Sequence, residues 1–270
     1  MKTLITHINP HLDDIAAIWL YKKFVPGFSD AKLEFIPASK DAAKTEESED
    51  KIFLGTGGGK FDEHKGDLED CATSLVWKYL IKENLAPEDI VEKKALDELV
   101  EWGRLIDLGK FPETEYGDFN VAAFIRPKDA TQEGSAKACW LGAEILDRIL
   151  EVLKNKQQSI KDWEDRVEFD TKFGKSFAVV SETVNRPFCK AMGGDLFLML
   201  DPKHGGVQFF TPSHEIDLEP IYKKVMELDP DADWYLHQSH HMVLCGAGSK
   251  PDVQKTKLSF EQLIEASKNA

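Results

Sequence analysis

The chain opens with Leu4-Ile5-Thr6-His7-Ile8-Asn9-Pro10-His11-Leu12-Asp13-Asp14, in which two histidines and two aspartates follow a short apolar run. The apolar run predicts a strand, and the apolar residues at helical spacing between Leu12 and Trp19 predict a helix. The two aspartates fall in the first turn of that helix, where the helix dipole favours negative charge. Ligand sites of open α/β sheets gather in loops at the carboxyl ends of strands. The stretch therefore predicts a metal site between a strand and a helix, with His7, His11 and Asp13 as ligands.

The patterns that follow divide the chain into two halves of different character. In the first half strand patterns alternate with helix patterns, which predicts an α/β domain with a parallel sheet. Its strands are expected at 4–6, 33–36 and 51–54, and its helices after Leu12, around 75–80, over 88–108 and over 132–153. The second half has strand patterns at 176–180, 195–200, 207–210, 233–236 and 242–244, and helix patterns at 218–228 and from 259. A smaller α+β domain is expected there.

A charged stretch separates the two halves, running from 154 to 170. It reads equally well as a linker and as the solvated face of a helix. We place the first domain at 1–165 and the second at 171–270.

The composition limits the class of partner. The formal net charge is -14, so a long nucleic-acid footprint is not expected, because such footprints need a basic surface that releases counterions. A small phosphate ester remains compatible with this charge, since bound divalent cations can dominate the charge inside a site. No stretch approaches the ~20 apolar residues of a membrane span, and the N-terminus has no signal-peptide core. We expect a cytoplasmic protein without a membrane partner.

Two residue types are expected to be structural. The four cysteines form no CxxC pair, which excludes a zinc ribbon and predicts reduced, buried thiols. The tryptophans at helical spacing are expected to pack in the core; they are Trp19, Trp77, Trp102 and Trp140.

Two later features carry further ligand-type residues. Phe61-Asp62-Glu63-His64 follows the glycine run Gly57-Gly58-Gly59. Such a run either turns the chain or presents backbone N–H groups to a phosphate. Asp107 falls in the last turn of a predicted helix that ends at Leu108-Gly109, where its charge opposes the helix dipole. The position therefore indicates a role other than helix stability.

Taken in order, these motifs resemble those of the DHH phosphoesterase superfamily. The superfamily has a similar His-x-x-x-His-x-Asp-Asp stretch after its first strand, a Phe-Asp-His-His motif, and a later aspartate before glycine at a helix end. Within it, the chain is most similar to the Myg-type exonuclease family (the melanocyte-proliferating-gene family). The segments 72–79, 234–239 and 255–257 add to this similarity, which spans most of the chain.

The resemblance implies a two-domain phosphoesterase with one or two Mn²⁺ or Mg²⁺ ions in a cleft between the domains. The implied metal ligands are His7, His11, Asp13, Glu63 and Asp107, with Asp107 bridging the ions. The implied catalytic residues are His64 and Asp62. His237 is the substrate-binding residue that the resemblance implies, and Ser239 belongs to the same similar segment. We add His241, Arg126, Gly57 and Gly58 as substrate-binding candidates that the resemblance itself does not give.

The chain departs from the family at two ligand positions. Glu63 replaces the first histidine of Asp-His-His, and glutamate oxygen still binds Mn²⁺ or Mg²⁺. Gly55 stands where the family has a metal-bridging aspartate, and glycine supplies no side-chain ligand. A two-metal site then holds its second ion weakly unless Asp14 or Asp62 takes that place.

Three hypotheses follow for the function. The first is a metal-dependent phosphodiesterase, a 3'-5' exonuclease in the narrower form, that hydrolyses short RNA, DNA or nucleotide phosphodiesters through a metal-activated water. The second is a catalytically degenerate relative that binds a nucleotide or phosphate, which Gly55 and Glu63 favour. The third is a single-metal hydrolase that uses His7, His11 and Asp107. The sequence leaves a homodimer open.

Overall fold

The computed structural model describes residues 1–270 except 39–46, 66–68, 114 and 247–251, so most of the loop expected at 39–50 lies outside the described residues. The chain divides into two compact units, Met1–Lys154 (unit 1) and Asn155–Ala270 (unit 2). Each unit has an apolar core of its own.

Unit 1 is built on a parallel sheet, as the alternating patterns predicted. Strand β1 (Thr3–His7) lies in the centre, between β2 (Lys32–Ile36) and β3 (Lys51–Phe53), and pairs in parallel with both. The pairing with β2 extends to His7, at the carboxyl end of β1, whereas the pairing with β3 ends at Ile5. The carboxyl end of β1 leads directly into the loop with the two histidines.

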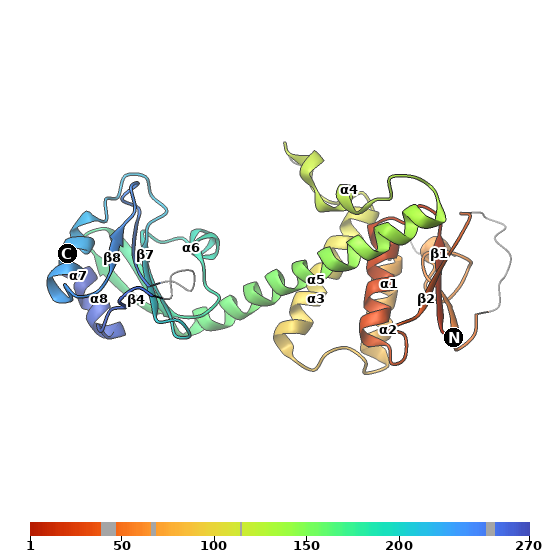
Figure 1. Cartoon of the computed structure of the whole chain (residues 1–270), viewed down its shortest axis with the longest axis horizontal. Coiled ribbons are helices and arrows are strands. Elements are labelled where there is room, and N and C mark those ends of the chain that lie inside the picture. The colour runs from red at the N-terminus through yellow and green to blue at the C-terminus, as the bar shows by residue number, and fades with distance from the viewer. Residues whose placement is uncertain (39–46, 66–68, 114, 247–251) are drawn as a thin grey trace. The chain divides into compact units, whose positions relative to one another are not determined.

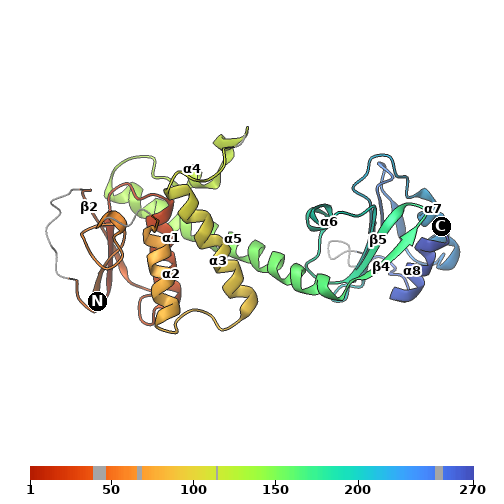
Figure 2. The same cartoon turned by 180° about the vertical axis from the view of Figure 1, so that it is seen from behind.

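The helices of unit 1 are α1 (Leu12–Phe24), α2 (Ala72–Lys82), α3 (Ile90–Asp107), α4 (Val121–Ile125) and the first part of α5 (Gln132–Asp162). Helices α1 and α2 pack side by side and both contact α3 (Figures 1 and 2). Helix α1 is buried without interruption from Leu12 to Tyr21. A helix surrounded in this way normally carries only apolar residues, yet Asp13 and Asp14 are each only 4 % exposed. Their burial indicates a role beyond solubility.

Unit 2 contains a six-stranded sheet in the order β4-β5-β6-β7-β9-β8, in which only the β5–β6 pair is parallel among the described strands. The strands are β4 (Val167–Thr171), β5 (Gly174–Val180), β6 (Leu196–Asp201), β7 (Gly206–Phe210), β8 (Trp234–Leu236) and β9 (Met242–Cys245). The helices are α6 (Arg186–Met192), α7 (Glu219–Leu228) and α8 (Phe260–Lys268). All five predicted strands and both predicted helices are confirmed, whereas β4 and α6 were not predicted.

The sheet of unit 2 has a core on each face. Ala178 packs with α7 and α8, while its neighbours Phe177 and Val179 pack with Trp163 and Cys189 on the opposite face. This alternation is the period of two that an extended strand imposes.

The charged stretch after 153 is helical at its start. Helix α5 continues without a break to Asp162, and β4 begins at Val167. The stretch contains neither glycine nor proline that would end a helix earlier. The stretch is therefore helical up to Asp162, and the boundary between the two units falls within it.

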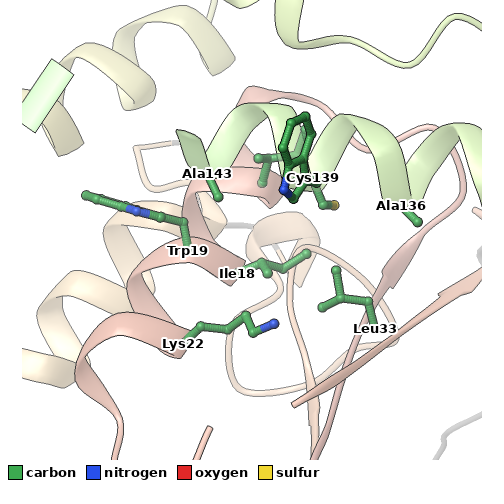
Figure 3. A pocket seen from close by; sticks show the side chains of 9 residues that line it. Ile18, Trp19, Lys22, Leu33, Ala136, Cys139 and Ala143 are labelled. Atoms are coloured by element: carbon green, nitrogen blue, oxygen red, sulfur yellow. The ribbon is translucent and has the colours of Figure 1, made fainter. Parts of the chain in front are cut away.

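The prediction that Trp140 packs in the core is wrong, because its side chain is 68 % exposed. The buried stripe of α5 passes through Cys139 and Leu146 instead, and Trp140 points off this stripe. It lines an apolar cavity of about 270 Å³ between α1, β2 and α5, with residues such as Ile18 and Leu33 (Figure 3).

Two further expectations concern the cysteines and the membrane. All four cysteines are buried and unpaired, as predicted. None of the helices formed by the described residues combines the length and the apolar character that a membrane span needs.

Candidate metal centre

The loop between β1 and α1 orients the first histidine. His7 is the last residue of β1, and its Nδ1 lies 2.9 Å from the carbonyl oxygen of Ile8. A neutral ring that donates from Nδ1 to this carbonyl has its lone pair on Nε2, the atom that would bind a metal ion. Nε2 lies 3.0 Å from Asp14 Oδ2, and this ion pair is the largest of the effects that raise the pKa of His7 to about 9.

Asp14 connects the two histidines. Its Oδ2 accepts the backbone N–H of His11 at 2.9 Å, which caps α1, and its Oδ1 accepts the hydroxyl of Thr6 at 3.2 Å. His7, His11 and Asp14 each offer a ligand atom, and the three atoms lie within 4.8 Å of one another. We call these three residues the first ligand group.

A second ligand group consists of Asp13, Glu63 and Asp107, whose ligand atoms also lie within 4.8 Å of one another. Both carboxylate oxygens of Asp13 accept backbone N–H groups at the start of α2, from Ala72 and from Thr73, at 2.8 Å each. The N-terminus of a helix stabilises such a negative charge. Asp107 is the last residue of α3, and Glu63 begins a short 3₁₀ turn at 63–65. Three segments far apart in sequence thus meet at this group.

Burial makes the carboxylates of the second group unusually basic. Burial, and then the charge of Asp14, raises the pKa of Asp13 to about 6. Burial is also the largest cause that raises the pKa of Glu63 to about 7, and the pKa of Asp107 is raised for the same reason. Like charges held close together in a partly dry environment are costly unless a cation compensates them.

One oxygen at this site has no partner within the described part of the chain. Glu63 Oε2 is buried and accepts no hydrogen bond there. A buried unsatisfied oxygen in a native fold indicates a missing partner such as an ion. Carboxylate oxygens and imidazole nitrogens are also the donors that Mn²⁺ uses, while Mg²⁺ favours oxygen. The residues of both groups therefore fit a divalent cation.

Position 55 explains how the first group is completed. Gly55 has a φ of +64°, and a Cβ on this residue would overlap Asp14 Oδ1. The carboxylate of Asp14 thus occupies the space of the side chain that glycine lacks. From the sequence, Asp14 was one of two candidates, with Asp62, to replace the bridging aspartate that the resembled family has at position 55. The available signal was its position beside Asp13, which places a carboxylate toward each group.

The pair Asp62 and His64 lies next to the second group. His64 Nδ1 is 2.9 Å from Asp62 Oδ1, and the His64 side chain is 74 % exposed. Burial lowers the pKa of His64, but the bond to Asp62 and the charge of Glu63 outweigh it, so that this pKa is raised. The backbone N–H of Gly58 donates to Asp62 Oδ2 at 2.6 Å, so it serves this loop rather than pointing at a bound phosphate. Gly57 has a φ of +76° and turns the chain.

The remaining candidates come from both units. Arg126 follows α4 in unit 1 and is exposed. His237, Ser239 and His241 lie in the loop between β8 and β9 of unit 2, where His237 Nδ1 is 2.8 Å from Ser239 Oγ. The ring of His241 contacts the ring of His214, with centroids 5.0 Å apart. Unit 1 therefore brings together the five predicted metal ligands and the two catalytic candidates, while these three substrate-binding candidates belong to unit 2.

No family model matches the chain, and no curated protein sequence does. Among solved structures, it is similar to an uncharacterized protein from Helicobacter pylori G27, with 14 % identity, all of both chains covered and a TM-score of 0.28. It is similar to the DHH domain of a protein described as a member of a family of ribosomal proteins, with 11 % identity, 98 % of this chain and 85 % of that chain covered and a TM-score of 0.32. It is also similar to a putative family II inorganic pyrophosphatase of Methanococcus jannaschii, with 13 % identity, all of both chains covered and a TM-score of 0.23. Similarities at these TM-scores carry no argument about this chain.

Proposed function

We propose that this chain is a metal-dependent phosphodiesterase of the DHH type that hydrolyses short RNA, DNA or nucleotide phosphodiesters. More specifically, we propose that it acts as a 3'-5' exonuclease of the Myg type. The observation that carries the proposal is the pair of ligand groups, His7–His11–Asp14 and Asp13–Glu63–Asp107. Because Asp13 and Asp14 are neighbours on α1, the two groups adjoin, which is the arrangement that two cooperating ions require.

The ions proposed are Mn²⁺ or Mg²⁺. The first group would hold one ion with two imidazoles and a carboxylate, and the second group would hold another with three carboxylates. Divalent cations at such a site lower the pKa of water and neutralise charge that develops on phosphoryl oxygens.

His64 is the residue proposed to handle a proton. Since Asp62 holds Nδ1, Nε2 is the ring atom that can donate to a phosphoryl or leaving oxygen. Asp62 is itself held by the N–H groups of Gly58 and His64, and its own pKa lies below the ordinary value, so it stays charged and fixes the ring. Asp62 is thus a positioning residue. Arg126, His237, Ser239 and His241 remain proposed donors to substrate phosphates.

A second candidate function is nucleotide or phosphate binding without catalysis. One observation favours it: His7 and Asp14 form an ion pair that neutralises the first group without a cation. A centre that is stable in this form has less need of metal than a site made only of carboxylates.

The two candidates separate by metal content and turnover of the full-length protein. We expect about two ions per chain by elemental analysis after loading with Mn²⁺. We also expect Mn²⁺-dependent release of mononucleotides from end-labelled RNA and DNA oligonucleotides, abolished by His11→Ala and by Asp107→Ala. Exposed residues outside the centre provide matched controls, His204→Ala and Asp30→Ala. Nucleotide binding without turnover under any divalent cation would favour the second candidate.

A further inference from the structure

The chain beside the metal centre exposes an unusual set of aromatic rings. We call residues 115–126, between α3 and α5, the aromatic segment. Tyr116 is 69 % exposed, Phe119 is 74 % exposed and Phe124 is 59 % exposed. Such rings carry large apolar surfaces that proteins normally bury, and a cluster of them indicates a binding surface. Figure 1 shows this yellow-green part of the chain, around α4, standing out from the other helices of unit 1.

The far end of the aromatic segment is anchored next to the first ligand group. Ile125 of α4 is fully buried, and a Cβ on Gly142 of α5 would meet the methyl groups of both Ile125 and Ile15. The absence of that Cβ lets α5 pack against both side chains, so Ile125 lies close to Ile15, the residue that follows Asp14. The anchored end of the segment therefore lies at the first turn of α1, where both ligand groups originate.

The chain on both sides of the segment also adjoins the centre. It emerges from α3, whose last residue is the ligand Asp107. Beyond the segment, Ser135 in the first turn of α5 accepts the backbone N–H of Asn9, in the loop between His7 and His11, at 3.0 Å. The residues on either side of the segment thus adjoin the metal centre, and the exposed Phe124 directly precedes the anchored Ile125.

The charge of the chain favours recognition by stacking. A protein with a net charge of -14 gains little affinity from a phosphate backbone outside its metal ions, so further affinity for a nucleotide is expected from contacts with its base. Aromatic side chains bind bases of any sequence through their π-faces. The Tyr116 and Phe119 rings have centroids 6.4 Å apart and are tilted by 55°, so they present separate faces. Arg126 at the end of the segment adds a cation, and no carboxylate among the described residues forms an ion pair with it.

We propose that Tyr116, Phe119 and Phe124 form the base-binding surface of the metal centre, with Arg126 beside them as a phosphate or base contact. The substrates are then phosphodiesters that carry nucleobases, and base-free phosphodiesters or phosphoanhydrides bind poorly. This inference rests on the proposed function and specifies its substrate class.

Binding in the absence of turnover tests the inference. The probe is the 5'-phosphorylated adenine dinucleotide pApA, titrated into the full-length protein with EDTA present and followed by calorimetry. The double variant Tyr116→Ala/Phe119→Ala should lose at least about tenfold in affinity for pApA. It should keep the wild-type affinity for the abasic analogue of the dinucleotide and the wild-type Mn²⁺ stoichiometry. The exchange Tyr116→Phe/Phe119→Tyr should restore pApA affinity, because it keeps both rings.

Trp140→Ala is the matched control, because it removes an equally exposed ring of unit 1 from α5 and should leave pApA binding unchanged.

Equal pApA affinity in the double variant and the wild type, or no pApA binding by the wild type, overturns the inference. So does an equal loss for the abasic analogue, which would indicate a structural role. A wild-type dimer that the double variant converts to a monomer would assign the rings to a subunit interface instead. If the wild type binds pApA but hydrolyses nothing with Mn²⁺, the proposed function fails while the base-binding surface stands.

Discussion

The carboxylate of Asp14 fills the space opposite Gly55 in which a side chain of residue 55 would otherwise lie. The same carboxylate pairs with the imidazole of His7 and accepts the backbone N–H of His11. Since Asp13 next to it serves the second ligand group, the first turn of α1 supplies one carboxylate to each group. The position that lacks a ligand in the sequence is therefore compensated by a neighbour in space.

Asp14→Asn should reduce metal binding. The amide keeps one oxygen that can accept the N–H of His11, so α1 remains capped, but it removes the negative charge of the first group. We expect the affinity for one Mn²⁺ per chain to fall at least about tenfold, as losses of metal ligands or of their supporting partners commonly do. Calorimetric titration measures this, with Asp30→Asn as the surface control. If the Asp14→Asn variant binds both Mn²⁺ ions with the affinity of the wild type, Asp14 is not a metal ligand.

Gly55→Asp tests the spatial relationship directly. The new side chain overlaps Asp14 and the residue must keep a φ of +64°, so we expect a loss of roughly 1–3 kcal/mol in the free energy of unfolding. The double variant Asp14→Gly/Gly55→Asp removes the overlap and should recover part of this loss, because aspartate tolerates positive φ better than most residues. Denaturant unfolding of the wild type, the two single variants Asp14→Gly and Gly55→Asp, and the double variant gives the coupling free energy between the two positions. Strictly additive effects would show that the two positions do not share this space.

Glu63→Gln should have opposite effects on the metal-free and the metal-loaded protein. The metal-free protein should gain stability, because a buried charge with an unpartnered oxygen becomes a neutral amide. The stabilisation by Mn²⁺ should shrink, because stabilisation by a ligand follows its affinity for the folded state. Melting temperatures with EDTA and with Mn²⁺ measure both effects. Equal Mn²⁺-induced shifts in the variant and the wild type would remove Glu63 from the ligand set.

Asp62→Asn should impair His64 without removing metal. The bond to Asp62 raises the pKa of His64 and holds its Nδ1. The variant should therefore show a kcat lower by roughly 10–100-fold. In its pH–rate profile, the fall in activity that accompanies deprotonation of His64 should shift to lower pH. Mn²⁺ stoichiometry should be unchanged. A variant that loses kcat but keeps the wild-type pH profile would show that Asp62 acts through loop structure rather than through the imidazole.

Asp229 in unit 2 allows a test of pH-dependent stability at a position remote in sequence from the proposed metal ligands. Asp229 caps the end of α7 and accepts the N–H of Lys257 at 2.8 Å and the hydroxyl of Thr256 at 2.7 Å. The Lys257 bond is the largest cause that lowers the pKa of Asp229. A lowered folded-state pKa stabilises the fold above the unfolded value of about 3.9, and this stabilisation is lost as pH falls through the folded value.

The expected consequence is a pH-dependent difference between Asp229→Asn and the wild type. The variant should melt at a lower temperature at pH 7. The gap should begin to narrow below about pH 4 and close as pH falls through the lowered folded-state pKa of Asp229. Thermal unfolding of the full chain across this range measures the gap. Glu215→Gln, at an exposed position, is the control. A gap of constant size would mean that the charge of Asp229 contributes nothing.

The sequence by itself determined most of the elements and the loop that carries the first candidate ligands. The three strands of the first sheet, the five strands predicted for unit 2 and the helix that begins at Leu12 all follow from periods of two and 3.6, which are local properties of the chain. The loop with His7 and His11 was recognisable for the same reason, because ligand-type residues stood where a strand had to end.

Only the tertiary structure decided which side chains share a site. Asp13 meets Glu63 and Asp107 through the packing of α1, α2 and α3, and no local period records those distances. The exposure of Trp140 and the clash between a side chain at 55 and Asp14 are equally invisible to periodicity. Local sequence encodes which way a residue faces along its own element, whereas a metal centre depends on where separate elements come together in space.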